Sequence, residues 1–205
     1  MLANLKMTEF IDRVGGDSAV PGGGSVAALS GALAAGLARM VANLTVGRER
    51  YAVVEPEMKA IAKEAAELQE RLTAEIDRDS AAYTGVMEAF KMAKNTDTEK
   101  TARARAIQAA MKDAATVPLE VAGHAFRVLE LAELVVQKGN KNAVTDGAVG
   151  AMLARTAVLA ALYNVKINLS AIRDKDFVKN MADAAADLEG KTETKEKEIL
   201  AHVDL

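Results

Sequence analysis

The feature that most constrains the fold is a stripe of ten positions in the segment from Glu55 to about Ala93. Successive members lie three or four residues apart, which places them on one face of an α-helix. They are Met58, Ile61, Ala65, Leu68, Leu72, Ile76, Asp79, Tyr83, Val86 and Phe90. Pro56 suits the first turn of such a helix, where its missing amide would have had no helical partner. The stripe predicts one long helix that buries an apolar face.

The same spacing of three and four recurs along the rest of the chain. We expect further helices at Met7–Val14, from a cap at Ser25 onward, from a Thr96/Glu99 capping box onward, from about Ala143 to Ile172, and from about Asp174 to the end. Half of the residues are hydrophobic but only 3% are aromatic, so small aliphatic side chains must build the core. The sequence therefore predicts an all-α, single-domain bundle of about six helices over residues 1–205, two of them long.

Pro118 falls inside the predicted fourth helix. Proline removes one helical hydrogen bond and its ring crowds the preceding turn, so we expect a kink between Ala114 and Pro118.

Composition excludes several classes of partner. The net charge of -3 leaves no basic stripe for a phosphate backbone, and aromatic residues to stack on bases are few, so nucleic acid is not expected. The chain has no cysteine, which fits a reducing compartment. It opens without a signal peptide, and the apolar run from Val26 to Ala38 is shorter than a membrane span. We expect a cytoplasmic protein without membrane contact.

Metal and nucleotide chemistry are poorly supported. His124 and His202 are the only histidines and lie in no ligand motif. The "PGGGS" turn lacks the lysine of a P-loop, and Ser25 lies in no GxSxG elbow. We expect neither a metal nor another cofactor.

The turn itself, Pro21 to Ser25, has two interpretations. It can be a flexible turn capped by Ser25. It can also be a site where free amides at a helix start attract an anion and side-chain-free residues let a flat ligand approach the backbone.

Asp79 is the sharper indication of function. A carboxylate on an apolar stripe costs several kcal/mol unless it is paired or protonated. Either an arginine on a neighbouring helix forms an ion pair with it, or burial raises its pKa for use as a general acid or base. Asp77 lies off the stripe and is expected to be solvated.

Other polar residues lie on the second and fifth helices. Asp146 is in a first helical turn, where it can simply complement the helix dipole. Asn164 follows five turns later, about 27 Å away at 1.5 Å per residue, and the same distance separates Ser25 from Asn43. One site can use both ends of these helices only if two subunits contribute, so we expect a homodimer. Asn43 and Asn168 can otherwise be core amides bonded to a neighbouring backbone.

Several segments together resemble one family. They are "PGGGSVAAL", "MVANLTVG", "DRDSAAYTGVMEAFK", "NTDTEK", "VPLE", "GNKNAVTDG" and "YNVKINLSAIRDKDF". In order and spacing they are similar to the formiminotetrahydrofolate cyclodeaminase and methenyltetrahydrofolate cyclohydrolase family. The resemblance implies an all-helical dimer that acts on a one-carbon unit at N5 and N10 of tetrahydrofolate without metal or redox cofactor.

With this resemblance, the candidate site can be stated in full. We predict Asp79 and Asp146 as catalytic residues. The predicted substrate-binding residues are Pro21, Gly22, Gly23, Gly24, Ser25, Asn43, Tyr83, Asn164 and Asn168. The anionic glutamate tail of folate would suit helix N-termini or Arg48 and Arg50. Because relatives often carry lysines in the segment that reads "GRERY" here, we assign no catalytic base to it.

Cyclohydrolase activity, which gives 10-formyltetrahydrofolate, is the preferred expectation because no formiminotransferase domain is fused to the chain. A stand-alone cyclodeaminase, which releases ammonia, is the alternative. A folate-binding helical scaffold without turnover is a third.

Overall fold

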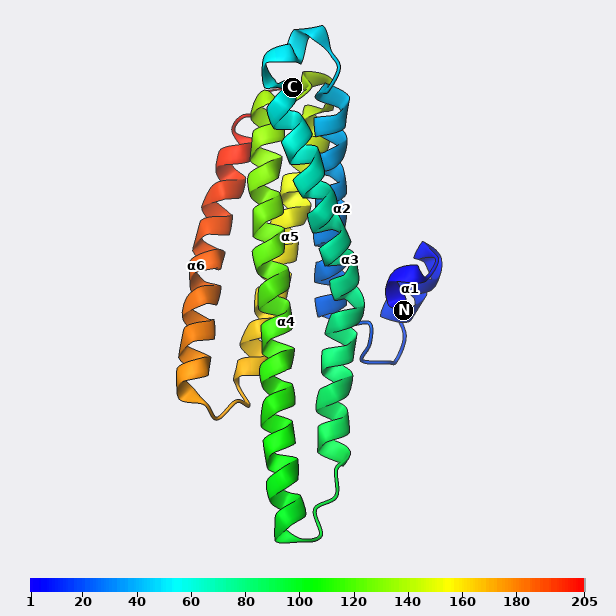
Figure 1. Ribbon diagram of the computed structural model, residues 1–205, viewed down its shortest axis with the longest axis vertical. Coiled ribbons are helices and arrows are strands. Elements are labelled where there is room, and N and C mark those ends of the chain that lie inside the picture. The colour runs from blue at the N-terminus through cyan, green and yellow to red at the C-terminus, as the bar shows by residue number, and fades with distance from the viewer. Residues whose placement is uncertain (205) are drawn as a thin grey trace.

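The computed structural model of the protein describes residues 1–204, which form an all-α bundle without strands in this range (Figure 1). The helices are α1 Met7–Val14, α2 Gly23–Thr45, α3 Glu55–Lys91, α4 Asp97–Lys138, α5 Val144–Leu169 and α6 Lys175–Leu200. Short 3-10 helices occupy Leu2–Asn4 (η1), Glu49–Val54 (η2) and Lys141–Ala143 (η3). The predicted fold class is confirmed, and α3 and α4 are the two longest helices, with 37 and 42 residues.

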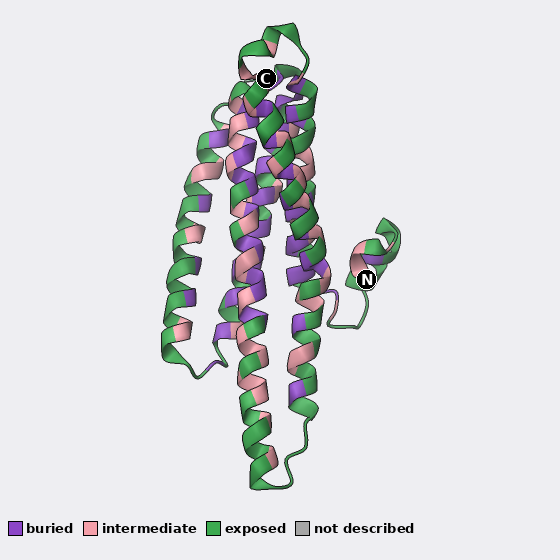
Figure 2. Cartoon of the chain, in the orientation of Figure 1, coloured by how far each residue is buried: buried purple, intermediate pink, exposed green. Residues whose placement is uncertain are grey.

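Four helices, α2 to α5, pack around one core, and α6 covers α4 and α5 (Figures 1 and 2). The core is built largely from alanine, valine and leucine. At Gly31 of α2, an added Cβ would lie 3.1 Å from a methyl group of Leu72 on α3. The absence of side chains on this part of α2 therefore lets the two helices approach closely.

Of the two predicted helix caps, the capping box at Thr96 is confirmed and the cap at Ser25 is wrong. The Thr96 hydroxyl accepts from the Glu99 amide, and the Glu99 carboxylate accepts from the Thr96 amide, which completes the capping box. Asp174 caps α6 by accepting from the Phe177 amide. Ser25, in contrast, does not cap α2. The helix begins at Gly23, and the Ser25 side chain turns toward α3 instead.

Pro118 does not break α4, which continues through it as one helix. A residue at this position would normally donate its amide to the carbonyl of Ala114, four residues earlier, and proline cannot. The side-chain amide of Asn168 on α5 donates to this carbonyl at 2.6 Å. The lost hydrogen bond within α4 is thus replaced by one between α4 and α5.

The long stripe on α3 is buried only along its first part, Met58 to Ile76. Beyond Asp79 it reaches the surface, and 41% of Tyr83 and 43% of Phe90 is exposed. The expectation of a buried stripe over all ten positions is therefore wrong. Asp79 lies where the face of α3 leaves the core.

Two segments, Gly23–Thr45 and Lys141–Leu169, are long and apolar enough to cross a membrane by length and composition alone. This corrects the expectation that the apolar run of α2 is too short. Both are bundle helices, with 61% and 50% of their most apolar windows buried inside the structure. Burial in a helical core explains such hydropathy without a membrane.

The large apolar residues that α2 and α5 leave exposed lie on two helices in contact with each other, and we call them together the α2–α5 face. Each exposed side chain is between 37% and 70% accessible. The two helices touch where the Ser30 hydroxyl donates to the Leu153 carbonyl at 3.0 Å, beside both sets of exposed residues. The face consists of Val26, Leu33, Met40, Leu44, Val149, Met152, Tyr163 and Ile167.

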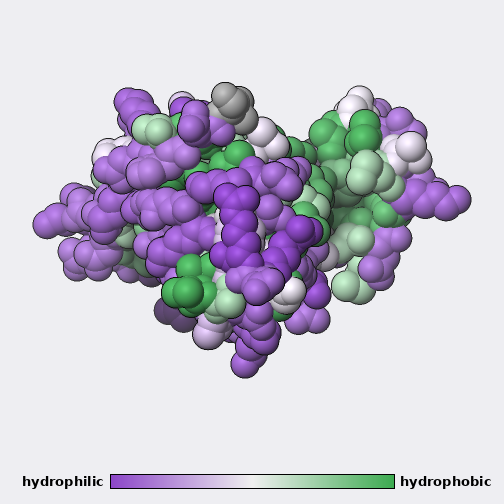
Figure 3. Space-filling model, turned by 90° about the horizontal axis from the view of Figure 1, so that it is seen from above, coloured by the Kyte–Doolittle hydropathy of each residue, from purple (hydrophilic) through white to green (hydrophobic). Residues whose placement is uncertain are grey.

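The N-terminal helix α1 stands away from the bundle (Figure 1). In the view from above, apolar surface gathers over this projection, whereas most of the bundle end is hydrophilic (Figure 3). Met7 and Ile11 of α1 are 73% and 60% exposed, and Phe10 is its one buried residue. The chain before α1 is held by Asp77 of α3, which accepts from the amides of Leu2 and Ala3. Asp77 is therefore an anchor for η1, and the expectation that it is merely solvated is wrong.

Candidate functional site

The candidate site is a cavity of about 360 Å³ between the glycine turn, the second half of α3, the middle of α4 and the end of α5. Four polar side chains face it: Asp79, Tyr83, Asn164 and Asn168. The remaining lining residues are Ala19, Val20, Gly22, Gly23, Gly24, Ala82, Val86, Met111, Ala114 and Ile167. A largely apolar wall with a few convergent polar groups is typical of a small-molecule site.

Ser25 fixes the position of Asp79. Its fully buried hydroxyl lies 2.9 Å from Oδ2 of Asp79, 3.0 Å from the Ile76 carbonyl and 3.0 Å from the Ser80 hydroxyl. These contacts join the first turn of α2 to the turn of α3 that carries the carboxylate. The side chain of Asp79 is therefore held at one place on the cavity wall.

Gly24 gives the carboxylate the space that it occupies. An added Cβ at Gly24 would lie only 2.0 Å from Oδ1 of Asp79 and 2.5 Å from its carboxyl carbon. At Gly23 the nearest atom to an added Cβ is the Asn164 side-chain nitrogen, at an ordinary contact distance of 3.6 Å. Asp79 therefore requires a glycine at position 24. Neither sequence interpretation of the turn included this reason.

The surroundings of Asp79 favour its protonated form. Burial raises the pKa of this carboxyl above the ordinary value of 3.8, and hydrogen bonds from the hydroxyl and amide of Ser25 oppose the rise without cancelling it. No lysine or arginine contributes to the shift. The alternative of a structural ion pair is therefore wrong within the described residues. A raised pKa brings proton exchange by Asp79 closer to neutral pH, as general acid–base catalysis requires.

Two asparagines of α5 complete the polar part of the wall. The Asn164 amide nitrogen donates to the Ala160 carbonyl at 2.9 Å, so its side chain is oriented by its own helix. Asn168 is oriented by the Ala114 carbonyl that Pro118 leaves free. Both amides line the cavity as predicted, and both also make the backbone bonds of the structural alternative.

The predicted residues divide into two groups. Gly22, Gly23 and Gly24 line the cavity with the four polar side chains; Ser25 lies directly behind Asp79, and Pro21 is buried in the adjoining turn. Asn43 and Asp146 do not belong to this cavity. They lie at the C-terminal end of α2 and the N-terminal end of α5, about 27 Å along these helices from Ser25 and Asn164.

Sequence reasoning missed the contribution of α4. Met111 and Ala114 line the cavity, but an apolar residue in a long helix carries no sign of a site. The available signal was Pro118, which marks a free carbonyl one turn earlier. Ile167, 69% exposed beside the cavity, was missed for the same reason as Met111.

Outside the cavity, the buried carboxylate of Glu75 has a histidine as its partner. His124 lies 2.9 Å from the carboxylate of Glu75, which is only 4% exposed. No group of three or more potential ligands from histidine, cysteine, aspartate and glutamate occurs within residues 1–204. Neither histidine lines the cavity.

These features define a helical-bundle protein with a carboxylate of raised pKa, beside the start of a helix and without an ion-pair partner in residues 1–204. Comparison with known proteins gives the family. Residues 6–187 match the family described as Formiminotransferase-cyclodeaminase, and the chain belongs to this family.

Its relatives include enzymes of two kinds. The methenyltetrahydrofolate cyclohydrolase of Methylorubrum extorquens is 39% identical over 86% of this chain and 85% of its own length. The formimidoyltransferase-cyclodeaminase of Mus musculus is 35% identical over 86% of this chain, but only 32% of that longer protein is matched. The crystal structure of formiminotetrahydrofolate cyclodeaminase from Thermotoga maritima has a TM-score of 0.89 and 32% identity, and the match covers 99% of this chain and 98% of that one.

Replacement of Gly24 by alanine is expected to lower ligand binding and turnover strongly, because the new methyl group would displace the Asp79 carboxylate. Gly85→Ala on α3 is the matched control, since Gly85 does not line the cavity and an added Cβ there meets nothing within 4 Å. We expect ligand binding and turnover to fall far more in Gly24→Ala than in Gly85→Ala, with both proteins folded by circular dichroism. Equal effects of the two substitutions would contradict the proposed fit between Gly24 and Asp79.

Asp79→Asn is expected to raise the free energy of unfolding at neutral pH. Because the pKa of Asp79 is raised in the folded protein, its contribution to stability is present below the ordinary pKa of 3.8 and is lost as pH rises through the folded value. The stability gained by Asp79→Asn should therefore grow as the pH rises from the ordinary pKa of 3.8 through the raised value of the folded protein. Urea titrations of both proteins measure it, with Asp183→Asn on the exposed surface of α6 as control. A gain that shrinks with rising pH would show that a cation stabilises the carboxylate.

Proposed function

We propose that this protein is a methenyltetrahydrofolate cyclohydrolase, which converts 5,10-methenyltetrahydrofolate and water to 10-formyltetrahydrofolate and a proton. The observation that carries the proposal is the carboxylate of Asp79, which lines a cavity of suitable size, has a raised pKa and has no cationic partner in residues 1–204. The similarity to the Methylorubrum enzyme over most of both chains supports the same reaction.

The chemistry requires proton transfer at one carbon. The methenyl bridge carries a positive charge shared between N5 and N10, so a carboxylate in a poorly solvated cavity attracts it. Water adds to the bridging carbon while Asp79 accepts its proton. The added hydroxyl group then loses its proton to solvent water as its C=O bond forms and the bond from this carbon to N5 breaks. N5 takes up a proton, and the formyl group remains on N10. Asp79 can return the proton to N5 because one carboxyl serves as base and then as acid.

The asparagines and the glycine turn would position the substrate. The amides of Asn164 and Asn168 can bond to a flat pterin ring, and the open backbone at Gly22 and Gly23 allows this ring to lie close. Tyr83, at the mouth of the cavity, offers an aromatic surface and a hydroxyl. The reaction needs no redox cofactor, and we propose that it uses no metal. The absence of cysteine supports a cytoplasmic location.

A second candidate is formiminotetrahydrofolate cyclodeaminase activity, which the similarity to the Thermotoga structure favours. In that reaction N10 attacks the formimino carbon and ammonia leaves. A protonated Asp79 would act as the acid for the departing nitrogen. The two reactions share the bridging carbon, so one cavity can serve either.

The proposal is tested by supplying methenyl- and formimino-tetrahydrofolate separately to the purified protein. We expect a higher kcat/KM for the methenyl compound, measured by its absorbance, than for the formimino compound, measured by ammonia release. We also expect the activity to survive EDTA. Asp79→Asn should lower kcat by about 10²- to 10⁴-fold while KM changes less, and Asp183→Asn should leave both unchanged. A preference for the formimino compound would establish the second candidate. Binding without turnover of either compound would indicate a folate-binding scaffold.

We further propose that the protein works as a homodimer joined through the α2–α5 face. This face exposes eight large apolar side chains on two neighbouring helices, more than an isolated surface usually leaves uncovered. A two-fold axis across it would place the two copies antiparallel. The far ends of α2 and α5, with Asn43 and Asp146, would then approach the cavity of the other copy.

This arrangement predicts complementation between two inactive variants. Asp79→Asn and Asp146→Asn should each be inactive as homodimers, whereas mixed dimers should regain activity, because one of their two sites keeps both carboxylates. Differently tagged, co-expressed chains would provide the mixed dimers. Leu33→Glu on the α2–α5 face should give monomers in equilibrium sedimentation and lose activity. A fully active monomer would contradict the proposal.

A further inference from the structure

Ser80 follows Asp79 on α3, and it does not line the cavity. Its hydroxyl lies 3.0 Å from the fully buried hydroxyl of Ser25 and makes no other hydrogen bond in residues 1–204. Ser25 in turn lies 2.9 Å from Oδ2 of Asp79. The three side chains therefore form a chain of contacts that starts at Ser80 and ends on the carboxylate.

The hydroxyl of Ser25 has one proton and makes three contacts, so the direction of each hydrogen bond can be worked out. The Ile76 carbonyl, at 3.0 Å, can only accept, and an ionised Asp79 can only accept. This carbonyl also lies four residues before Ser80 in α3, where it accepts the Ser80 amide within the helix. A carboxylate is a stronger acceptor than a carbonyl that already has a donor. The proton of Ser25 therefore goes to Oδ2 of Asp79.

Ser80 must then be the donor in its contact with Ser25. Ser25 has used its only proton on Asp79, and its two lone pairs remain to accept. A hydroxyl that accepts one hydrogen bond donates a stronger one, because each bond polarises the next. Ser80 therefore strengthens the bond from Ser25 to the carboxylate, although its own hydroxyl makes no hydrogen bond to Asp79 in residues 1–204.

The other carboxylate oxygen, Oδ1, is left for the cavity. No side chain in residues 1–204 donates a hydrogen bond to it. It lies beside Gly24, where an added Cβ would be 2.0 Å away, and Gly24 lines the cavity. Because the bond from Ser25 occupies Oδ2, Oδ1 is the oxygen that can exchange a proton with a molecule in the cavity.

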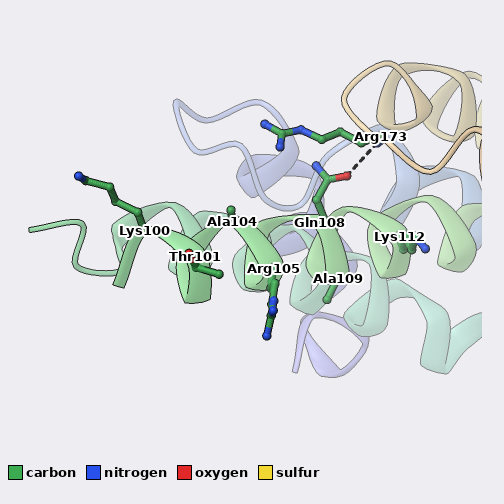
Figure 4. Close-up of a pocket in the computed structure, with 8 residues that line it drawn as sticks. All are labelled: Lys100, Thr101, Ala104, Arg105, Gln108, Ala109, Lys112 and Arg173. Atoms are coloured by element: carbon green, nitrogen blue, oxygen red, sulfur yellow. Dashed lines mark hydrogen bonds between the residues drawn. The ribbon is translucent and has the colours of Figure 1, made fainter. Parts of the chain in front are cut away.

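The elements around Asp79 contribute no other charged side chain to the cavity lining in residues 1–204, and Tyr83 is the other titratable group there. Lys100, Arg105 and Lys112 of α4 line a separate groove with Arg173, and this groove shares no residue with the cavity (Figure 4). The charged residues next to Asp79 on α3 have partners elsewhere: Glu75 pairs with His124, Asp77 with the amides of Leu2 and Ala3, and Arg78 with Glu120. The hydroxyl chain is therefore the polar contact that distinguishes the two oxygens of Asp79.

We propose that Ser80 is a positioning residue for Asp79: its hydroxyl holds Ser25 as a donor to Oδ2 and so leaves Oδ1 as the oxygen that exchanges the proton. The inference rests on the proposed function for the use that Asp79 makes of this proton, whereas the hydrogen bonds themselves lie within the protein. Ser80 touches no reacting atom and acts through Ser25.

The test measures the titration of the Asp79 carboxyl directly, by carbon-13 NMR of protein labelled at aspartate, with its signal identified by loss in Asp79→Asn. Ser80→Ala should raise the pKa of Asp79 by about 0.5, a threefold change in proton affinity, because the ionised form loses part of its hydrogen bonding. Ser80→Thr keeps the hydroxyl and should restore the wild-type titration. Thr73→Ala is the matched control, since it removes another half-buried hydroxyl of α3, one that bonds to the Gln69 carbonyl of its own helix.

A double variant separates a role through Ser25 from a role of Ser80 in packing. Ser25→Ala should raise the pKa of Asp79 by about 1, a tenfold change in proton affinity. Adding Ser80→Ala to Ser25→Ala should have no further effect, because the chain is already broken. In the dependence of kcat/KM on pH with the methenyl compound, the acidic limb should move to higher pH in Ser80→Ala and stay in place in Ser80→Thr.

The outcomes separate this proposal from the one on which it rests. An Asp79 titration that is unchanged in Ser80→Ala, or that Ser80→Ala shifts equally with and without Ser25, would overturn the role of Ser80 and leave the proposed activity intact. If Ser25→Ala is unfolded by circular dichroism, the comparison of Ser80→Ala with Ser80→Thr and Thr73→Ala decides by itself. Absence of turnover with every folate, together with the expected titrations, would overturn the proposed function while supporting the positioning of Asp79 by Ser80.

Discussion

The contact between Ser25 and Asp79 is the interaction on which the site depends. It fixes the start of α2 against the turn of α3 where the apolar face of that helix leaves the core. Gly24 allows the contact because it presents no side chain to the carboxylate. One local arrangement therefore explains why position 24 is a glycine and why Ser25 does not cap its helix. We expect the Asp79 carboxylate to lower the free energy of unfolding, since burial of a neutral amide at this position would cost less desolvation free energy.

Packing through small residues has consequences on both sides of α2 and α5. Toward the core, alanine and glycine let the helices approach closely and bring α2, α3 and α5 to one cavity. Away from it, the same two helices expose larger apolar residues such as Leu33 and Met152. Helices with two apolar sides, one against their own bundle and one uncovered, are typical of subunits whose assembly completes the burial.

The fold was largely predictable because apolar spacing and capping chemistry are local properties of the sequence. The capping box at Thr96 and the start of α6 near Asp174 were predicted directly from residue types. The site was only partly predictable. Asp79 was found because a carboxylate conflicts with its apolar neighbours, whereas Met111 conflicts with nothing and was missed. For Asp79 the sequence left two alternatives open, an ion pair with an arginine or a raised pKa, because the serine hydroxyl that contacts it comes from the start of α2 and is brought close only by tertiary packing.

Pro118 shows how two positions far apart in the chain come to share one role. The proline leaves the Ala114 carbonyl without its helical donor, and Asn168 supplies the missing hydrogen bond from another helix. Each residue is favourable chiefly because the other is present. Such a pair is expected to change together during divergence of the family, since loss of either leaves a buried polar group unsatisfied or an asparagine without its anchor. The orientation of Asn168, at the end of α5 beside the cavity, therefore depends on a proline in α4.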